Sequence, residues 1–217
     1  MPFNFVQLIA ILVGLVVAIT IHEFSHALVA RQLGDPTAER MGRLSLNPLV
    51  HLDPLGSIMM LITAITGFGI GWGKPTPVNP WNLRPGRRLG MAIVALGGPI
   101  SNLLLALVFS VVLHLAPTMP LAVMSILVQM AALNLGLAAF NILPLPMLDG
   151  FHVLMGIVSS IRTRGASTLV GQLERIEAQG SMILLILIMA GYVFRFPILT
   201  ILIQPIFGLL AKLVGLG

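Results

Sequence analysis

The chain has 217 residues, of which 57% are apolar and 9% are charged, and its formal net charge is +5. Soluble domains carry about a quarter charged residues, so this composition excludes an ordinary soluble globule, and it also excludes a disordered chain. Backbone groups in lipid must be paired internally, and the apolar runs are continuous rather than alternating, which leaves an all-α polytopic membrane protein.

Five apolar stretches reach or approach the roughly 20 residues that a membrane helix needs. In chain order they are residues 5–29, 54–72, 89–115, 121–143 and 181–214. Arg195 and Pro197 divide the last stretch into two shorter pieces. The sequence therefore predicts about five to six transmembrane helices.

The second stretch differs from the others because glycine alternates with larger residues from Gly67 to Gly73. Each glycine inside a helix costs about 1 kcal/mol of stability. Glycine is instead typical of extended backbone that a ligand or another chain segment approaches closely. If this stretch enters the membrane and returns, ten of the twelve Lys and Arg residues lie on one face, as the positive-inside rule favours. We therefore expect a glycine-rich re-entrant segment, a candidate for short β structure, at residues 54–73, and a cytoplasmic basic face.

Two acidic residues, Glu23 and Asp149, lie in or next to the apolar segments, where a charged side chain is costly and usually functional. Glu23 belongs to an H-E-x-x-H sequence that runs from His22 to His26. Residues four apart share a helix face, so both imidazoles can bind one ion, and Glu23 beside them can deprotonate a water. Zinc lowers the pKa of such a water to about 7. We expect one zinc ion per chain.

A catalytic zinc site needs a third protein ligand and leaves its fourth position for water. The chain has no cysteine, so the remaining candidates are Asp149, His51, His114 and His152. Pro144 and Pro146 break the fourth helix just before Asp149, and this places the carboxylate at the depth of the two histidines. His51 and His152 are alternatives in or near loops, whereas His114 lies toward the opposite face.

Together these motifs resemble the site-2 protease family of intramembrane zinc metalloproteases, in its short bacterial and archaeal branch without a PDZ or CBS domain. Besides H-E-x-x-H, the resemblance rests on Asn141, Leu148-Asp149-Gly150, Gly67-Phe68-Gly69 and Gly97-Gly98-Pro99-Ile100-Ser101-Asn102. It covers about residues 15–155. Phe151 stands where many members have a second glycine, which leaves the motifs of the metal site intact.

The resemblance implies specific roles for these residues. His22, His26 and Asp149 would bind zinc, and Glu23 would be the catalytic base. Asn141 would hold the substrate carbonyl or the developing oxyanion, although an amide that packs helices together is the alternative interpretation. An unwound substrate strand would pair with the glycine-rich backbone, which contributes Gly67, Phe68, Gly69 and Gly71.

The activity implied is hydrolysis of peptide bonds in or near the transmembrane segment of single-pass membrane proteins, by a zinc-activated water, as in regulated intramembrane proteolysis. We expect one membrane-embedded protease domain over residues 1–217, with a catalytic core at about 5–155 and C-terminal helices at about 181–215. The expected location is the prokaryotic plasma membrane, multi-pass, with the site near the cytoplasmic side.

Expected partners are substrate proteins and membrane lipid. Nucleic acid is excluded because the basic residues form no face interleaved with aromatics. A membrane transporter or ion carrier that uses the same polar residues is the alternative function. Against it, the sequence has no repeat symmetry.

Overall fold

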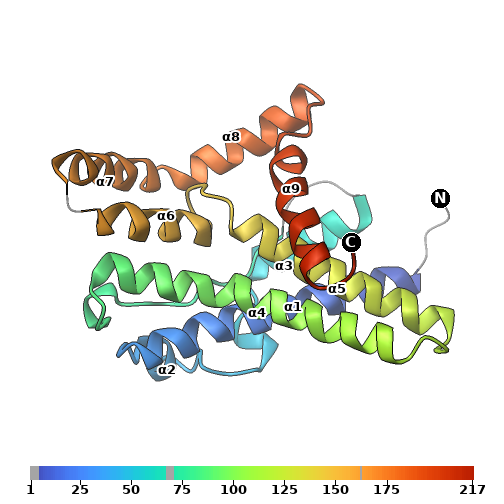
Figure 1. The fold of residues 1–217 in the computed structure, drawn as a ribbon. Coiled ribbons are helices and arrows are strands. Elements are labelled where there is room, and N and C mark those ends of the chain that lie inside the picture. Colours follow the sequence, from blue (N-terminus) through green and yellow to red (C-terminus); the bar gives the residue numbers. More distant parts are fainter. Residues whose placement is uncertain (1–4, 67–70, 162) are drawn as a thin grey trace.

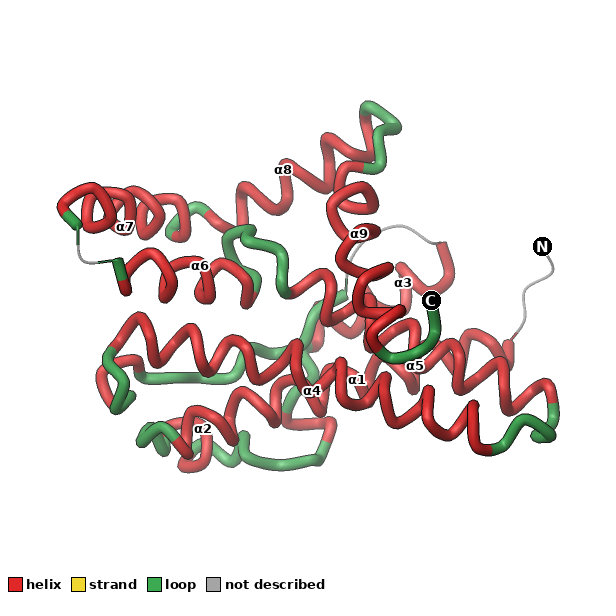
Figure 2. Tube along the Cα trace, in the orientation of Figure 1, coloured by secondary structure: helices red, strands yellow, loops and turns green. Residues whose placement is uncertain are grey.

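The computed structural model of the protein describes residues 5–66, 71–161 and 163–217. Within these ranges the chain is helical and has no β-strand (Figure 1, Figure 2). The helices in chain order are α1 (Phe5–Gln32), α2 (Thr37–Arg40), α3 (Pro54–Thr66), α4 (Arg87–Leu115), α5 (Leu121–Asn141), α6 (Asp149–Ser160), α7 (Arg164–Glu177), α8 (Gly180–Val193) and α9 (Ile198–Leu213). Two short 3-10 turns, η1 (Pro48–Val50) and η2 (Pro80–Asn82), lie in the loops. The predicted all-α class is confirmed.

In the part of the chain that the structure describes, three helices, α1, α4 and α5, are long and apolar enough to cross a membrane. The other apolar helices, α3, α8 and α9, have 13, 14 and 16 residues, which gives lengths of about 20 to 24 Å at about 1.5 Å per residue. As predicted, the C-terminal stretch divides near Arg195 and Pro197, because proline cannot continue a helix from the residue before it. The membrane association of the chain follows from these helices, while the expected count of five to six spans stays a prediction.

The core of the fold is the contact of α4 with α1, α5 and α6. Figure 1 shows α4 antiparallel to both α1 and α5, with α6 lying along the first half of α4. Glycine allows this close approach: a Cβ atom on Gly156 of α6 would lie 2.3 Å from the Cβ of Ala92 on α4. The first half of α4 is therefore held alongside α6 and next to the second half of α1.

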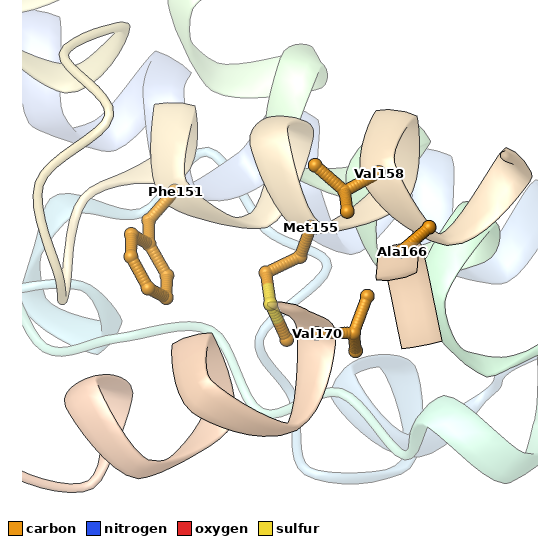
Figure 3. Packing of buried hydrophobic residues seen from close by; sticks show 5 residues of the cluster. All are labelled: Phe151, Met155, Val158, Ala166 and Val170. Atoms are coloured by element: carbon orange, nitrogen blue, oxygen red, sulfur yellow. The ribbon is translucent and has the colours of Figure 1, made fainter. Parts of the chain in front are cut away.

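An amphipathic helix, α7, covers the outer side of α6. Figure 3 shows Phe151, Met155 and Val158 of α6 packed against Ala166 and Val170 of α7. The C-terminal half of α7 is tied to the start of α4, because the Glu174 carboxylate accepts hydrogen bonds from Arg87 at 2.8 Å and Arg88 at 2.9 Å. The hydrogen bond from Arg88 holds the pKa of Glu174 below its ordinary value.

A buried carboxylate joins the loops at the C-terminal end of α1. Asp35 is fully buried and accepts hydrogen bonds from the backbone N–H of Asn79 at 2.6 Å and the Asn82 amide at 2.8 Å, as well as from Thr37. Burial raises the pKa of Asp35, but the hydrogen bonds from Thr37, Asn82 and Asn79 outweigh it, so the pKa lies below its ordinary value. The chain that precedes α4 is thereby fixed against the end of α1.

Residues 54–73 are helical over most of their described part, rather than extended. The apolar run from Ser57 to Thr66 contains no glycine, and it makes up most of α3. The only β structure among the described residues is an antiparallel bridge between Leu52 and Gly73, beside which the Lys74 N–H donates to the His51 carbonyl at 2.7 Å. The two ends of the segment therefore lie side by side.

Candidate metal centre

The H-E-x-x-H sequence lies in the second half of α1, where its two histidines share one face. The imidazole rings of His22 and His26 have centroids 4.6 Å apart. Their Nε2 atoms face the carboxylate of Asp149: His22 Nε2 is 3.1 Å from Oδ2, and His26 Nε2 is 3.4 Å from Oδ1. One ligand atom from each of the three residues lies within 4.8 Å of the other two. Tertiary folding thus brings together the three residues that the sequence proposes as ligands.

Asp149 reaches the histidines because the chain turns sharply between α5 and α6. Helix α5 ends at Asn141, and the turn that contains Pro144 and Pro146 follows, with Met147 in the left-handed region at φ 73°. Gly150 must be glycine here, since a Cβ atom would lie 2.1 Å from the Ile142 carbonyl oxygen. Asp149 is the first residue of α6, and the positive end of the helix dipole stabilises its negative charge.

Helix α4 fixes the orientation of both imidazole rings. His26 Nδ1 is 2.8 Å from the Val94 carbonyl oxygen, and His22 Nδ1 is 2.7 Å from Asn102 Oδ1. A neutral imidazole with a proton on Nδ1 has a lone pair on Nε2. Hydrogen bonds of this kind commonly orient the histidine ligands of metals. In both residues the Nε2 atom is therefore the one available to a metal ion.

The three side chains fit a zinc ion. Asp149 Oδ2 is buried and has no hydrogen-bond partner among the described residues, although His22 Nε2 is only 3.1 Å away. A buried oxygen and a facing nitrogen lone pair repel each other unless a proton or a cation lies between them. Two imidazole nitrogens and a carboxylate oxygen form one of the ligand sets that catalytic zinc uses.

The absence of a side chain at Gly98 leaves space for the two imidazole rings of the site. A Cβ atom on Gly98 of α4 would lie 2.5 Å from His22 Cε1 and 2.5 Å from His26 Nε2. Real Cβ atoms do not approach other atoms so closely, so any side chain here would push both rings apart. The Gly97-Gly98-Pro99 sequence of α4 is thus part of the wall of the site.

We expect Gly98→Ala to weaken zinc binding by at least about 10-fold, the lower end of the loss seen when the surroundings of metal ligands are changed. Helix propensity alone would favour alanine by about 1 kcal/mol, so the expected loss comes from the clash with the rings and not from helix propensity. Zinc affinity, measured by competition with a chromogenic chelator, checks this. Gly136→Ala on α5 is the control, because its Cβ would meet nothing within 4 Å. Equal zinc affinity in the two variants would contradict the prediction.

Glu23 points to the extended segment that precedes α4. Its Oε2 atom accepts hydrogen bonds from the Thr76 N–H at 2.8 Å and the Thr76 hydroxyl at 2.7 Å. The same hydroxyl lies 2.9 Å from the Glu23 carbonyl oxygen. Arg43 is buried nearby and donates to the Lys74 carbonyl. Both bonds from Thr76 fall on Oε2, and Oε1 accepts neither of them. The contact with Thr76 has no signal in the sequence.

The other predicted site residues lie outside this cluster. Asn141 ends α5, and its amide donates to the Leu137 carbonyl at 3.0 Å. The alternative ligands are engaged elsewhere: His51 Nε2 lies 2.6 Å from the Ser45 carbonyl oxygen, and His152 lies 3.2 Å from Glu177. His114 bonds within its own helix, to the Ser110 carbonyl oxygen.

The predicted substrate-binding residues are described only in part. Gly71 is packed against α3, since a Cβ atom there would lie 2.0 Å from Met60 Cγ. The remaining three, Gly67, Phe68 and Gly69, lie outside the described residues.

Comparison with known proteins agrees with a zinc enzyme. The model of Peptidase family M50 matches residues 116–190, which include Asp149. "Putative zinc metalloprotease YwhC" of Bacillus subtilis is 41% identical over 159 residues, which are 68% of this chain and 68% of the relative. No solved structure matches the chain significantly.

Two mycobacterial relatives are similar at lower identity. "Putative zinc metalloprotease Rip2" of Mycobacterium tuberculosis is 33% identical over 149 residues, which are 67% of this chain and 56% of the relative. The Rip2 protein of Mycolicibacterium smegmatis is 32% identical over 163 residues, which are 70% of this chain and 59% of the relative. The cofactor of this enzyme is zinc, and the chain belongs to peptidase family M50, the site-2 protease family of zinc metalloproteases.

Proposed function

We propose that this protein cuts other membrane proteins within or near their transmembrane segments, with zinc held by His22, His26 and Asp149 and with Glu23 as the general base. The observation that carries the proposal is that two of the three residues of the metal cluster, His22 and His26, lie on α1, a helix long and apolar enough to span a membrane. His26 and His22 precede Arg31, in the last turn of α1, by 5 and 9 residues. At about 1.5 Å per residue these are depths of about 8 and 14 Å.

In the proposed reaction Glu23 takes a proton from the attacking water as the water oxygen bonds to the substrate carbonyl carbon. Bound zinc supplies Lewis acidity, which makes that water more acidic and polarises the carbonyl. The bonds from Thr76 hold the Glu23 carboxylate in one orientation. When the carbon–nitrogen bond breaks, Glu23 delivers the proton to the departing amine nitrogen.

Asn141 is the proposed donor to the substrate carbonyl oxygen. A carboxamide nitrogen carries two hydrogens, and the Asn141 amide gives one of them to Leu137. The second is available to the oxygen that gains negative charge during the attack, a role generally worth a few kcal/mol.

We further propose that residues 54–73 re-enter the membrane from the side that carries the basic residues, and that this side is cytoplasmic. The bridge between Leu52 and Gly73 and the short length of α3 support a segment that returns to its starting side. Arg31 lies in the last turn of α1, and Arg87 begins α4. Figure 1 shows these two helix ends at the same end of the molecule. A multi-pass enzyme of the cell membrane with its zinc site near the cytoplasm follows from this arrangement by the positive-inside rule.

The test uses the purified protein in detergent micelles with a model single-pass transmembrane protein as substrate. Product masses locate the cut, and a parallel reaction contains a zinc chelator. We expect cleavage in or near the transmembrane segment, its loss on chelation, and its recovery when zinc is restored. Cleavage that persists in the chelator, or that falls only in soluble regions of the substrate, contradicts the proposal.

A further inference from the structure

Two asparagines are fully buried where the three long helices meet, Asn102 on α4 and Asn134 on α5. A buried carboxamide in a spanning helix is costly unless it is hydrogen-bonded. Both of these are. Asn102 Nδ2 donates to Asn134 Oδ1 at 2.9 Å and to the Ala18 carbonyl of α1 at 3.0 Å, and Asn134 Nδ2 donates to the Met130 carbonyl at 2.8 Å. The pair thus connects α5, α4 and α1.

Backbone carbonyls determine which way each carboxamide points. The Met130 carbonyl can only accept, so the Asn134 atom beside it is the nitrogen, and Asn134 presents its oxygen to Asn102. Asn102 must therefore turn its nitrogen toward Asn134, and the Ala18 carbonyl requires the same orientation. The only Asn102 atom left to face His22 is Oδ1, which is an acceptor.

The orientation of Asn102 in turn determines the proton position on His22. Because Asn102 Oδ1 accepts, the His22 Nδ1 atom at 2.7 Å must carry the proton. The lone pair of the neutral ring then lies on Nε2, the atom that faces Asp149. His26 reaches the same state through the Val94 carbonyl, which no substitution of a side chain removes. His22 therefore depends on side chains for its tautomer, and His26 does not.

We propose that Asn134 and Asn102 are positioning residues that hold His22 in the tautomer that binds metal through Nε2. This inference rests on the zinc site of the proposed function. It assigns a second role to α5: Asn134 lies seven residues, or about two turns, before Asn141, so both face the same side of the helix. One helix would then set the position of a metal ligand and of the amide proposed for the substrate carbonyl.

A purely structural role, in which the amides only hold the helices together, predicts different mutational results. Under that role the number of hydrogen bonds retained matters, and it does not matter which atom faces His22. Under the positioning role the acceptor next to His22 Nδ1 matters most. Outer hydrogen-bond partners of metal ligands typically contribute 10- to 100-fold to metal affinity.

The experiment measures zinc affinity of the full chain by chelator competition. We expect Asn102→Leu to weaken zinc binding by about 10- to 100-fold. Asn102→Asp keeps an acceptor for His22 but loses both donated bonds, and we expect it to recover most of that affinity. Asn134→Leu should have a smaller effect than Asn102→Leu, since the bond to Ala18 still orients Asn102.

The matched control is Ser110→Ala, which removes a buried hydrogen bond between α4 and the Val214 carbonyl, two turns beyond Asn102. Its zinc affinity should equal that of the wild type. The ¹⁵N chemical shifts of His22 in the metal-free protein, recorded at alkaline pH where the imidazole ring is neutral, give a second readout that does not depend on the aspartate variant folding. They should report protonated Nδ1 in the wild type and a mixture of tautomers in Asn102→Leu.

Two negative results are distinguishable. If His22→Ala loses zinc while Asn102→Leu binds it as the wild type does, or if His22 keeps the same tautomer in both proteins, the positioning role is wrong and the zinc site stands. If the wild type and His22→Ala bind zinc equally, the zinc site itself is wrong, and the inference fails with it.

Discussion

Glu23→Gln is expected to lower the rate of substrate cleavage by about 100- to 10,000-fold, the usual contribution of a general base, while zinc binding is unchanged. Glutamine has the same shape as glutamate but cannot take a proton from water. Its amide oxygen can still accept the bonds from Thr76, so the local structure is retained. Zinc binding persists because the metal cluster contains His22, His26 and Asp149 and not Glu23. Cleavage rates and bound zinc are measured on the same purified samples.

The control for this result is Glu39→Gln, the same chemical change in a residue close to the end of α1. Glu39 forms a partly exposed ion pair with Arg31 at 2.9 Å, and such pairs contribute about 0 to 1 kcal/mol to stability. We expect its cleavage rate to match that of the wild type. Turnover by Glu23→Gln at a rate close to that of Glu39→Gln would overturn the assignment of the base.

Asp149→Asn is expected to weaken zinc binding by more than about 100-fold and to abolish cleavage. Removing a residue that only hydrogen-bonds to a metal ligand costs up to about 100-fold in affinity, and changing a ligand itself should cost more. The neutral amide replaces the only carboxylate of the cluster, so the ion loses the one charged ligand among its three protein ligands. Zinc content after dialysis and affinity by chelator competition measure the effect. Added zinc should restore little activity at concentrations that saturate the wild type.

Asp53→Asn is the matched control for Asp149→Asn. Asp53 Oδ1 accepts a hydrogen bond from the Gly56 N–H at the start of α3, and asparagine is about as good as aspartate in that capping role. We expect this variant to bind zinc and cleave substrate as the wild type does. If Asp149→Asn retains zinc to the same degree, then another residue supplies the third ligand.

The sequence predicts the helical elements well because they depend on local chemistry. The apolar stretches at 89–115 and 121–143 correspond closely to α4 and α5, since a continuous apolar run of that length is stable in lipid only as a helix. The exception is the segment at 54–73. Its glycines suggest extended backbone, but the part up to Thr66 forms α3, because Gly56 is the one glycine in that part and the ten residues after it contain none.

The candidate site divides in the same way. The H-E-x-x-H spacing by itself places His22 and His26 on one face of one helix, and this is a consequence of helix geometry alone. The sequence favours Asp149 over His51 and His152 through the prolines before it and through the family resemblance. The turn after α5 and the contact between α4 and α6 bring its carboxylate to the histidines. These contacts join residues far apart in the chain, and no local pattern encodes them.

The sequence by itself determined that the protein is a membrane-associated helical bundle with a two-histidine metal motif. Only the tertiary structure decided what else surrounds that motif: the Thr76 contact to Glu23 and the Asn102 contact to His22. The physical reason is that apolar runs and i, i+4 spacing act within a few residues, whereas hydrogen bonds between helices form only after the helices pack. A buried asparagine has the same sequence signature whether it packs two helices or orients a metal ligand, and its neighbours in space decide between them.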